Sequence, residues 1–312
     1  MGIAHYIREI GRGKQGAKHL TREQACDLML QVLKTSVEPV ALGAFCVAMR
    51  IKGETADEML GFLDAIHTQL TFFKNTHAKP VVVLPSYNGS RRLPLLTPLL
   101  AKLLSQQGHG VLIHGCQSED ARVTSEDLLP ALGIQPASQT SAIEPGEVVF
   151  VPTALLSQGL WSLLQVRRQT GLRNSGHSLV KLLNPVAGPS LQVASYTHPE
   201  YAISMQETLQ RMHAHAMLLR GTEGEPVADP RKTPSMRCLV SGEMSPEFHI
   251  EADVQHQTVD LPTGMDTRQS MQFMNDLLSG KLAIPPSLLV QIDVINRLSL
   301  VCTQKTSRTK PK

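Results

Sequence analysis

A change in hydrophobic periodicity near residue 79 most constrains how this 312-residue chain can fold. Before it, apolar residues recur at helical spacing, and two segments open with capping-box sequences, Thr21-Arg22-Glu23-Gln24 and Thr55-Ala56-Asp57-Glu58. After it, short runs of aliphatic and β-branched residues alternate with apolar helical stretches. This order predicts a small helical domain followed by a larger α/β domain with a mostly parallel sheet.

Short apolar runs mark the expected strands, at residues 81–84, 111–113, 148–151, 191–194 and 217–219. Apolar stretches at helical spacing mark the expected helices, at residues 95–104, 125–132 and 287–301. The segment 41–51 is apolar nearly all round, so we expect a helix packed between other elements. We place the helical domain at 1–75, the α/β domain at 76–302 and a disordered basic tail at 303–312.

The composition excludes several classes of protein. No apolar run approaches the length of a membrane span, and residues 1–10 contain no apolar signal-peptide core. The five cysteines lie far apart and are odd in number, which favours neither a zinc site nor a disulfide framework. No G-x-S-x-G hydrolase motif occurs. We therefore expect a protein of the reducing cytoplasm that does not associate with membranes.

The basic residues are distributed unevenly, although the net charge is only +3. Two acid-free stretches, 65–118 and 148–199, carry Lys74, Lys79, Arg91, Arg92 and Lys102, and Arg167, Arg168, Arg173 and Lys181, respectively. If these stretches meet in the fold, they form a positive surface that attracts polyanions, with Arg12, Lys14 and Lys18 as a candidate extension. Buried strands and helices would give the same acid-free pattern, and that alternative stays open.

Several segments resemble anthranilate phosphoribosyltransferases, which belong to glycosyltransferase family 3. They are residues 20–23, 48–55, 166–173 and 182–185, and they follow the order of the family's motifs. The resemblance covers most of the chain. It implies a helical domain hinged to an α/β domain, a substrate cleft between the two, and a homodimer formed through the helical domain.

The segments that correspond to the enzymes' chemical motifs differ from them. The resemblance places the glycine-rich pyrophosphate loop at residues 85–92, where Pro85 has no N–H to donate. The remaining phosphoribosyl-site positions are Asn88, Gly89, Thr97, His114 and Gly115. The enzymes' paired Asp-Glu magnesium ligands fall on Pro226 and Val227, which leaves Glu223 and Glu225 as weak metal candidates. We therefore expect no catalytic residue and no cofactor, with magnesium needed only by an active transferase.

Four further segments are similar to the YbiB branch of this family, and they are residues 86–89, 173–179, 195–201 and 221–225. Members of that branch are regarded as DNA-binding proteins without the parent activity. The resemblance thus implies DNA as the partner, with RNA as a second candidate. Together with the charge pattern, it predicts that phosphate groups are bound by Arg91, Arg92, Arg167, Arg168, Arg173, His177 and Lys181.

Three functions from different classes stay open. We favour sequence-independent nucleic-acid binding by a basic groove, because the pyrophosphate and metal motifs are lost. The alternative is an active phosphoribosyl or glycosyl transferase that acts on a different acceptor. A third possibility is an interaction protein whose basic face binds an acidic protein, which would show the same charges. Neither the preference for DNA or RNA nor the preference for single or double strands follows from the sequence.

Overall fold

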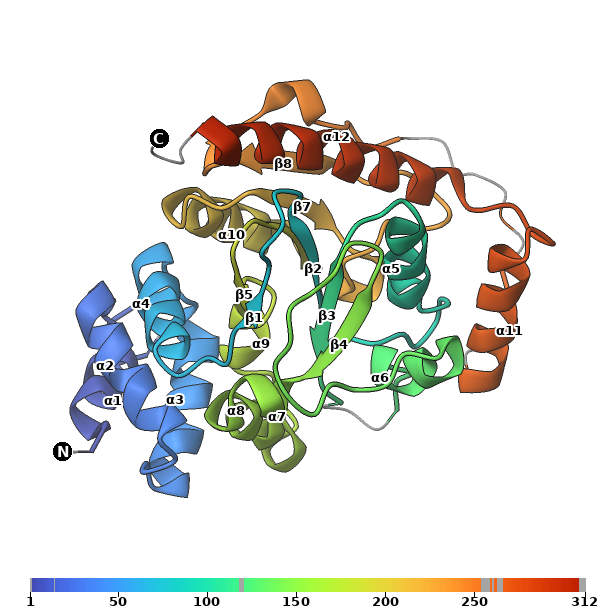
Figure 1. Cartoon of the computed structure of the whole chain (residues 1–312). Coiled ribbons are helices and arrows are strands. Elements are labelled where there is room, and N and C mark those ends of the chain that lie inside the picture. The colour runs from blue at the N-terminus through green and yellow to red at the C-terminus, as the bar shows by residue number, and fades with distance from the viewer. Residues whose placement is uncertain are drawn as a thin grey trace. The chain divides into compact units, whose positions relative to one another are not determined.

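The computed structural model describes residues 2–13, 15–117, 121–253, 259, 261–262 and 266–308. The chain forms two compact units (Figure 1). We call Met1–Thr71 with Thr153–Leu183 the helical unit, and Phe72–Pro152 with Asn184–Lys312 the α/β unit. The expected division at residue 75 assigns residues 153–183 to the α/β domain, whereas the structure groups them with the N-terminal helices. Periodicity along a chain does not reveal which distant segments pack together.

The helical unit contains the two helices for which capping boxes are predicted. Its helices are α1 (Ala4–Ile10), α2 (Arg22–Leu33), α3 (Pro39–Lys52), α4 (Ala56–His67), α7 (Thr153–Leu156), α8 (Gln158–Thr170) and α9 (Gly176–Leu179). Both capping boxes are confirmed: Thr21 accepts from the Gln24 N–H, and Thr55 accepts from the Glu58 N–H. Each box satisfies donors that a helix start leaves without intrahelical partners, and so fixes where α2 and α4 begin.

Helix α3 is buried on one side only. Phe45, Cys46 and Met49 are buried, whereas Val40 is 86% exposed and Ile51 is 61% exposed. The prediction of a helix packed between other elements is therefore wrong for its outer face. An apolar composition indicates that a helix has surfaces to bury, but it does not say whether the same chain covers all of them.

The α/β unit is built on a seven-stranded sheet with the order β4-β3-β2-β6-β7-β8-β9. Its strands are β2 (Val81–Ser86), β3 (Val111–Gly115), β4 (Val148–Pro152), β6 (Ser190–Tyr196), β7 (Ala216–Arg220), β8 (Met236–Val240) and β9 (Glu243–Met244). The five predicted strands are confirmed, and all five run parallel. Strands β8 and β9 add an antiparallel edge. Strands β1 (Phe73–Lys74) and β5 (Val186–Ala187) form a separate parallel pair.

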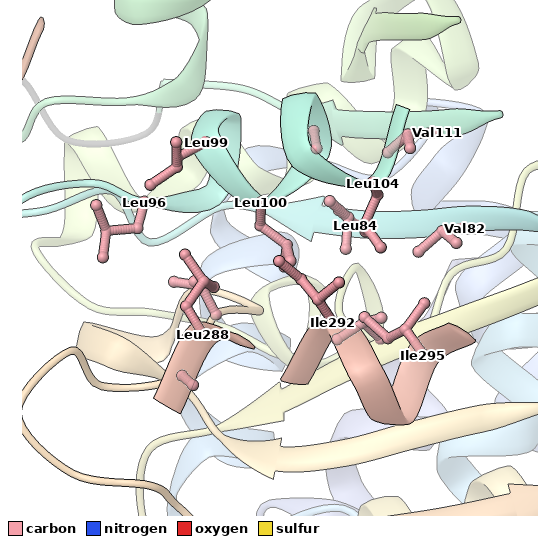
Figure 2. Packing of buried hydrophobic residues seen from close by; sticks show 14 of the residues in the cluster. Val82, Leu84, Leu96, Leu99, Leu100, Leu104, Val111, Leu288, Ile292 and Ile295 are labelled. Carbon is pink, nitrogen blue, oxygen red and sulfur yellow. The ribbon is translucent and has the colours of Figure 1, made fainter. Parts of the chain in front are cut away.

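Helices pack on this sheet and close its core. The α/β unit contains α5 (Thr97–Gln106), α6 (Ser125–Leu128), α10 (Pro199–Arg211), α11 (Thr267–Leu278) and α12 (Pro286–Arg308), with short 3-10 turns at Leu129–Leu132, Thr222–Gly224 and Pro246–Phe248. Figure 2 shows Leu100 and Leu104 of α5 and Ile292 of α12 within one buried cluster that also includes Val82 and Leu84 of β2. This core holds β2 in the middle of the sheet, so the loop that follows β2 starts from a fixed position.

The C-terminal helix is longer than the sequence predicts. The expected helix at 287–301 is confirmed, but α12 continues to Arg308, so residues 303–308 are helical rather than a disordered tail. No glycine or proline interrupts this segment, and Cys302 is buried. Residues 309–312, like Lys14, lie outside the described part of the chain. Over the residues that are described, no helix has both the length and the hydropathy needed to cross a bilayer.

Candidate phosphate-binding site

Two loops meet at the carboxyl edge of the sheet in the α/β unit. Residues 87–92, the basic loop, follow β2, and residues 221–225, the acidic turn, follow β7. The two are packed so closely that a Cβ added to Gly224 would lie 2.0 Å from the Asn88 Nδ2 atom. Gly224 also has a φ of +90°, which side chains rarely tolerate. The carboxyl edge is where parallel α/β sheets usually bind ligands.

Glu225 of the acidic turn fills the inner part of the basic loop. Its side chain is 1% exposed, and its Oε1 atom accepts hydrogen bonds from the backbone N–H groups of Asn88 at 2.7 Å and Gly89 at 2.8 Å. Its Oε2 atom accepts from the hydroxyl groups of Ser86 at 2.5 Å and Thr97 at 2.9 Å. An ionised carboxylate can accept all of these bonds. The inner backbone donors of the loop are thus already bound to an anion of the same chain.

Glu223 fills the outer part of the loop in the same way. Its two carboxylate oxygens accept from the backbone N–H groups of Arg91 at 2.5 Å and Arg92 at 2.9 Å. Its backbone carbonyl oxygen accepts from the Asn88 side-chain amide at 2.7 Å. Glu223 has a φ of 52°, an uncommon backbone conformation for a residue other than glycine. The acidic turn therefore places one carboxylate at each end of the basic loop.

The acidic turn lies near several arginines of the α/β unit. Arg91 and Arg92 are exposed, and no described residue forms an ion pair with either guanidinium group. The Arg122 guanidinium lies 3.9 Å from the Glu223 carboxylate. Arg231 pairs with Asp229, and this hydrogen bond is the main reason why the pKa of Arg231 is raised, with a smaller contribution from the Glu223 charge. Within the part of the chain that is described, Arg91 and Arg92 are thus the two arginines at this site whose charge no acid pairs.

Sequence reasoning missed Arg122 and Arg231 because it searched for acid-free stretches. Glu119 and Asp120 precede Arg122 in the sequence, and Asp229 precedes Arg231, so both arginines fall in segments of mixed charge. The sequence does place residues 114–122 in a loop after an expected strand, where parallel sheets bind ligands, but it does not single out Arg122 within that loop.

The remaining predicted phosphate-binding residues belong to the helical unit. Arg168 at the end of α8 is exposed, whereas Arg167 and Arg173 are half-buried and Lys181 is buried. His177 is only 6% exposed, and its Nδ1 atom accepts from the Asn174 N–H at 3.3 Å. Burial is the main reason why the pKa of His177 is lowered to about 3, followed by the charges of Arg173 and Arg167. A neutral, buried ring is poorly suited to bind an anion.

The predicted groove combines residues from both units. Arg91 and Arg92 belong to the α/β unit, and Arg167, Arg168 and Arg173 belong to the helical unit. The contacts described above bring basic residues together within the α/β unit. The continuous groove, its contacts with phosphate and its extension by Arg12 and Lys18 stay predictions.

The predicted phosphoribosyl-site positions are in contact with residues of their own unit. Asn88, Gly89 and Thr97 all donate to Glu225. His114 is buried in β3, and its Nδ1 atom lies 2.8 Å from the Tyr87 hydroxyl oxygen. Gly115 lies against β2, where an added Cβ would be 2.2 Å from the Ser86 carbonyl oxygen. These positions therefore hold the basic loop against the acidic turn and against β3.

The two carboxylates of the acidic turn face hydrogen-bond donors. Magnesium prefers a shell of oxygen ligands, whereas hydrogen-bond donors surround the Glu223 and Glu225 carboxylates. Within the described ranges, no group of three or more His, Cys, Asp or Glu residues is arranged to hold a metal ion. The weak metal candidates of the sequence are instead acceptors for donors of the basic loop.

Comparisons with known proteins agree with this architecture. Residues 4–69 match the helical bundle domain of the glycosyl transferase family. The anthranilate phosphoribosyltransferase of Pelotomaculum thermopropionicum is 29% identical over 229 residues, which cover 71% of this chain and 64% of the enzyme. The crystal structure of the anthranilate phosphoribosyltransferase from Thermus thermophilus aligns with a TM-score of 0.68 at 21% identity, over 96% of this chain and 97% of the enzyme chain.

The fold is thus that of the anthranilate phosphoribosyltransferases, with an N-terminal helical bundle and a mostly parallel α/β sheet, which confirms the predicted fold class. A more extensive sequence match is to the Escherichia coli K12 protein YbiB. It is 36% identical over 298 residues, which cover 94% of this chain and 92% of YbiB. The chain belongs to the same family as YbiB, as the resemblance of its loop segments predicts.

Proposed function

We propose that this protein binds nucleic acid without sequence preference, by contacts between its arginine side chains and the phosphate backbone. The observation that carries the proposal is the division of roles within the basic loop. Four of its backbone N–H groups are bound to Glu223 and Glu225, whereas the side chains of Arg91 and Arg92 are exposed to solvent. Such a loop presents charge at the surface, while Glu225 keeps its inner N–H groups from a small phosphorylated substrate.

The same observation argues against the transferase alternative. A phosphoribosyl donor would need the inner backbone N–H groups of the loop, which are bound to the buried Glu225 carboxylate, and the charge of that carboxylate would repel the donor's pyrophosphate. The residues that bind magnesium in the enzymes have no counterpart with suitable chemistry here. Transfer also requires that the donor be held in one geometry, which exposed side chains without fixed partners do not provide.

Arginine-rich surfaces suit nucleic acid because the planar guanidinium group donates paired hydrogen bonds to phosphate oxygens. Phosphate contacts carry no sequence information, so affinity should vary little with base sequence. Aromatic residues make up only 4% of the chain, which disfavours binding dominated by base stacking. Arg91, Arg92 and Arg122 in the α/β unit and Arg168 in the helical unit are the contacts that we propose.

We further propose that the protein is a homodimer formed through α3. The exposed apolar or small residues Val40, Ala44, Val47 and Ile51 follow helical spacing, so they form one stripe along this helix. A second copy would bury the stripe and double the number of arginines available to one ligand. Val47→Glu places a charge in that interface, and sedimentation should then give a monomer where the unmodified protein gives a dimer.

A salt titration tests the nucleic-acid proposal. If about six phosphates are neutralised, the logarithm of affinity should fall with the logarithm of salt concentration at a slope of roughly −5. The variant Arg91→Ala/Arg92→Ala should flatten the slope by about one to two units and weaken DNA of every sequence alike. Its melting temperature should stay the same, because both side chains are exposed.

The matched control is Lys34→Ala/Arg268→Ala, which also removes two positive charges. Both residues are exposed: Lys34 follows the last residue of α2, and Arg268 lies on α11. We expect this variant to keep the unmodified slope. If the two double variants behave alike, the basic loop is not the binding surface, and an acidic protein becomes the favoured partner. Turnover of anthranilate with phosphoribosyl pyrophosphate by the unmodified protein would instead support the transferase alternative.

A further inference from the structure

We propose that Glu223 is an internal substitute for a phosphate group, which a phosphate of the ligand displaces from the N–H groups of Arg91 and Arg92. Two successive backbone N–H groups point at the two oxygens of one carboxylate. Successive N–H groups that converge in this way form an anion-binding concavity, and phosphate oxygens can accept the same bonds. The site is thus complete and is occupied by the chain itself.

The surroundings of this concavity favour a phosphate over a single carboxylate. The Arg122 guanidinium lies 3.9 Å from Glu223, the Arg91 and Arg92 side chains leave the same loop, and the Glu223 charge also acts on Arg231. Among the described residues, no acid forms an ion pair with the exposed Arg91 and Arg92 guanidinium groups, so they add positive charge that the Glu223 carboxylate does not pair. A phosphate has more acceptor oxygens than a carboxylate, so it could bind the loop N–H groups and a guanidinium group at the same time.

Glu223 can leave its position far more readily than Glu225. Glu223 has a side chain that is 16% exposed, two donors on its carboxylate and an uncommon φ of 52°. Glu225 is 1% exposed and accepts from four donors. Rotation of the Glu223 side chain into solvent would open the outer end of the loop while Glu225 still held the inner end. The acidic turn therefore combines one fixed carboxylate with one displaceable carboxylate.

Displacement has a predictable effect on affinity. While Glu223 is in place, it reduces the positive potential at the arginines and competes with any incoming phosphate. Removal of its carboxylate should therefore strengthen phosphate binding. The shared chemistry is a phosphate group, which can come from a small diphosphate or from a nucleic-acid backbone. Only the second source rests on the proposed function.

The test uses the full chain with Glu223→Ala and, as a matched control, Glu243→Ala, which removes an exposed carboxylate from β9 in the same unit. Isothermal titration with inorganic pyrophosphate at low ionic strength should show binding at least about tenfold tighter for Glu223→Ala than for the unmodified protein. Glu243→Ala should not differ from the unmodified protein. Equal behaviour of the two variants would overturn the proposal.

Parallel titrations with DNA separate this inference from the proposed function. Glu223→Ala should bind DNA more tightly and steepen the salt slope by about 0.9, the value for one added phosphate contact. If no variant binds DNA but Glu223→Ala gains pyrophosphate affinity, the proposed function fails and the occupied phosphate site stands. A DNA gain that Glu243→Ala reproduces would be a general charge effect and would also overturn the inference. If Glu223→Ala lowers the melting temperature, Glu223→Gln replaces it in the same titrations, because the amide removes the charge and keeps one acceptor oxygen for the loop.

Discussion

The basic loop and the segment 167–181 contain similar residues but expose different parts of them. In the basic loop, the backbone N–H groups of Arg91 and Arg92 are bound to Glu223, and the side chains of both arginines reach solvent. In the segment 167–181, Arg168 is exposed but His177 and Lys181 are buried. Basic residues in a sequence therefore indicate a binding surface only where the fold leaves the charged end of the side chain outside. The two regions differ because the acidic turn binds the backbone of the basic loop, whereas the packing of α9 buries the His177 side chain.

The largest expected effect concerns the acid that fixes the basic loop. Glu225→Ala would leave two backbone N–H groups and two hydroxyl groups without their acceptor in a buried site. Unsatisfied buried donors of this kind cost about 1–3 kcal/mol each when relaxation does not help, so we expect a loss of about 3–5 kcal/mol in the free energy of unfolding. Denaturant unfolding of the variant measures this loss.

Glu243→Ala again serves as the control, and it should change the unfolding free energy by less than about 0.5 kcal/mol, as is usual for surface substitutions. A loss below about 1 kcal/mol for Glu225→Ala would mean that the loop holds its shape without this acid. The contrast between a fixed Glu225 and a displaceable Glu223 would then have no structural basis.

A smaller effect is expected from the pH dependence of the helical unit. Burial lowers the pKa of His177 from 6.5 to about 3, so the folded protein keeps the ring neutral while the unfolded chain takes up a proton below pH 6.5. This contribution to stability is complete above pH 6.5 and is lost as the pH falls toward 3. Within that window, the unmodified protein should lose up to about 1.4 kcal/mol per pH unit more than the His177→Asn variant.

Melting curves or denaturant unfolding between pH 4 and 7 provide the measurement. If the two proteins lose stability in parallel, His177 is protonated in the folded state, and it would then be available as a cationic contact for phosphate. That outcome would reduce the difference between the two basic regions and restore the role that the sequence predicts for His177.

Local signals in the sequence predicted much of the fold. A capping box depends on residues three positions apart, and the five parallel strands depend on short runs, so both can be recognised without knowledge of the packing. The exposed side of α3 could not be predicted, because an apolar face looks the same whether its own chain or another one covers it. For a related reason, the sequence places residues 153–183 in the α/β domain, whereas the structure places them in the helical unit. Which helices belong to one unit depends on contacts between distant segments of the chain.

The candidate site was predicted only in part, because it depends on long-range pairing. The sequence identified the basic loop, and Glu223 and Glu225 as carboxylates near it. It gave no sign that these acids bind the loop, since the hydrogen bond from Asn88 to Glu225 joins residues 137 positions apart. The motif pattern therefore makes these acids weak metal candidates, whereas their contacts make them acceptors for backbone N–H groups of the basic loop.

The smallest expected effect compares an exposed and a buried cation within the helical unit. Arg168 is exposed, although its Nε–H donates to the Gln165 side-chain oxygen at 2.8 Å, and Lys181 is buried. Arg168→Ala should flatten the salt slope of DNA binding by about 0.9, whereas Lys181→Met, which removes the charge and keeps an unbranched side chain, should leave the slope unchanged. Salt titrations of the two variants, with melting temperatures as the folding control, make the comparison. A larger change for Lys181→Met would show that the ligand reaches this lysine despite its burial, and exposure would then no longer distinguish binding residues from structural ones.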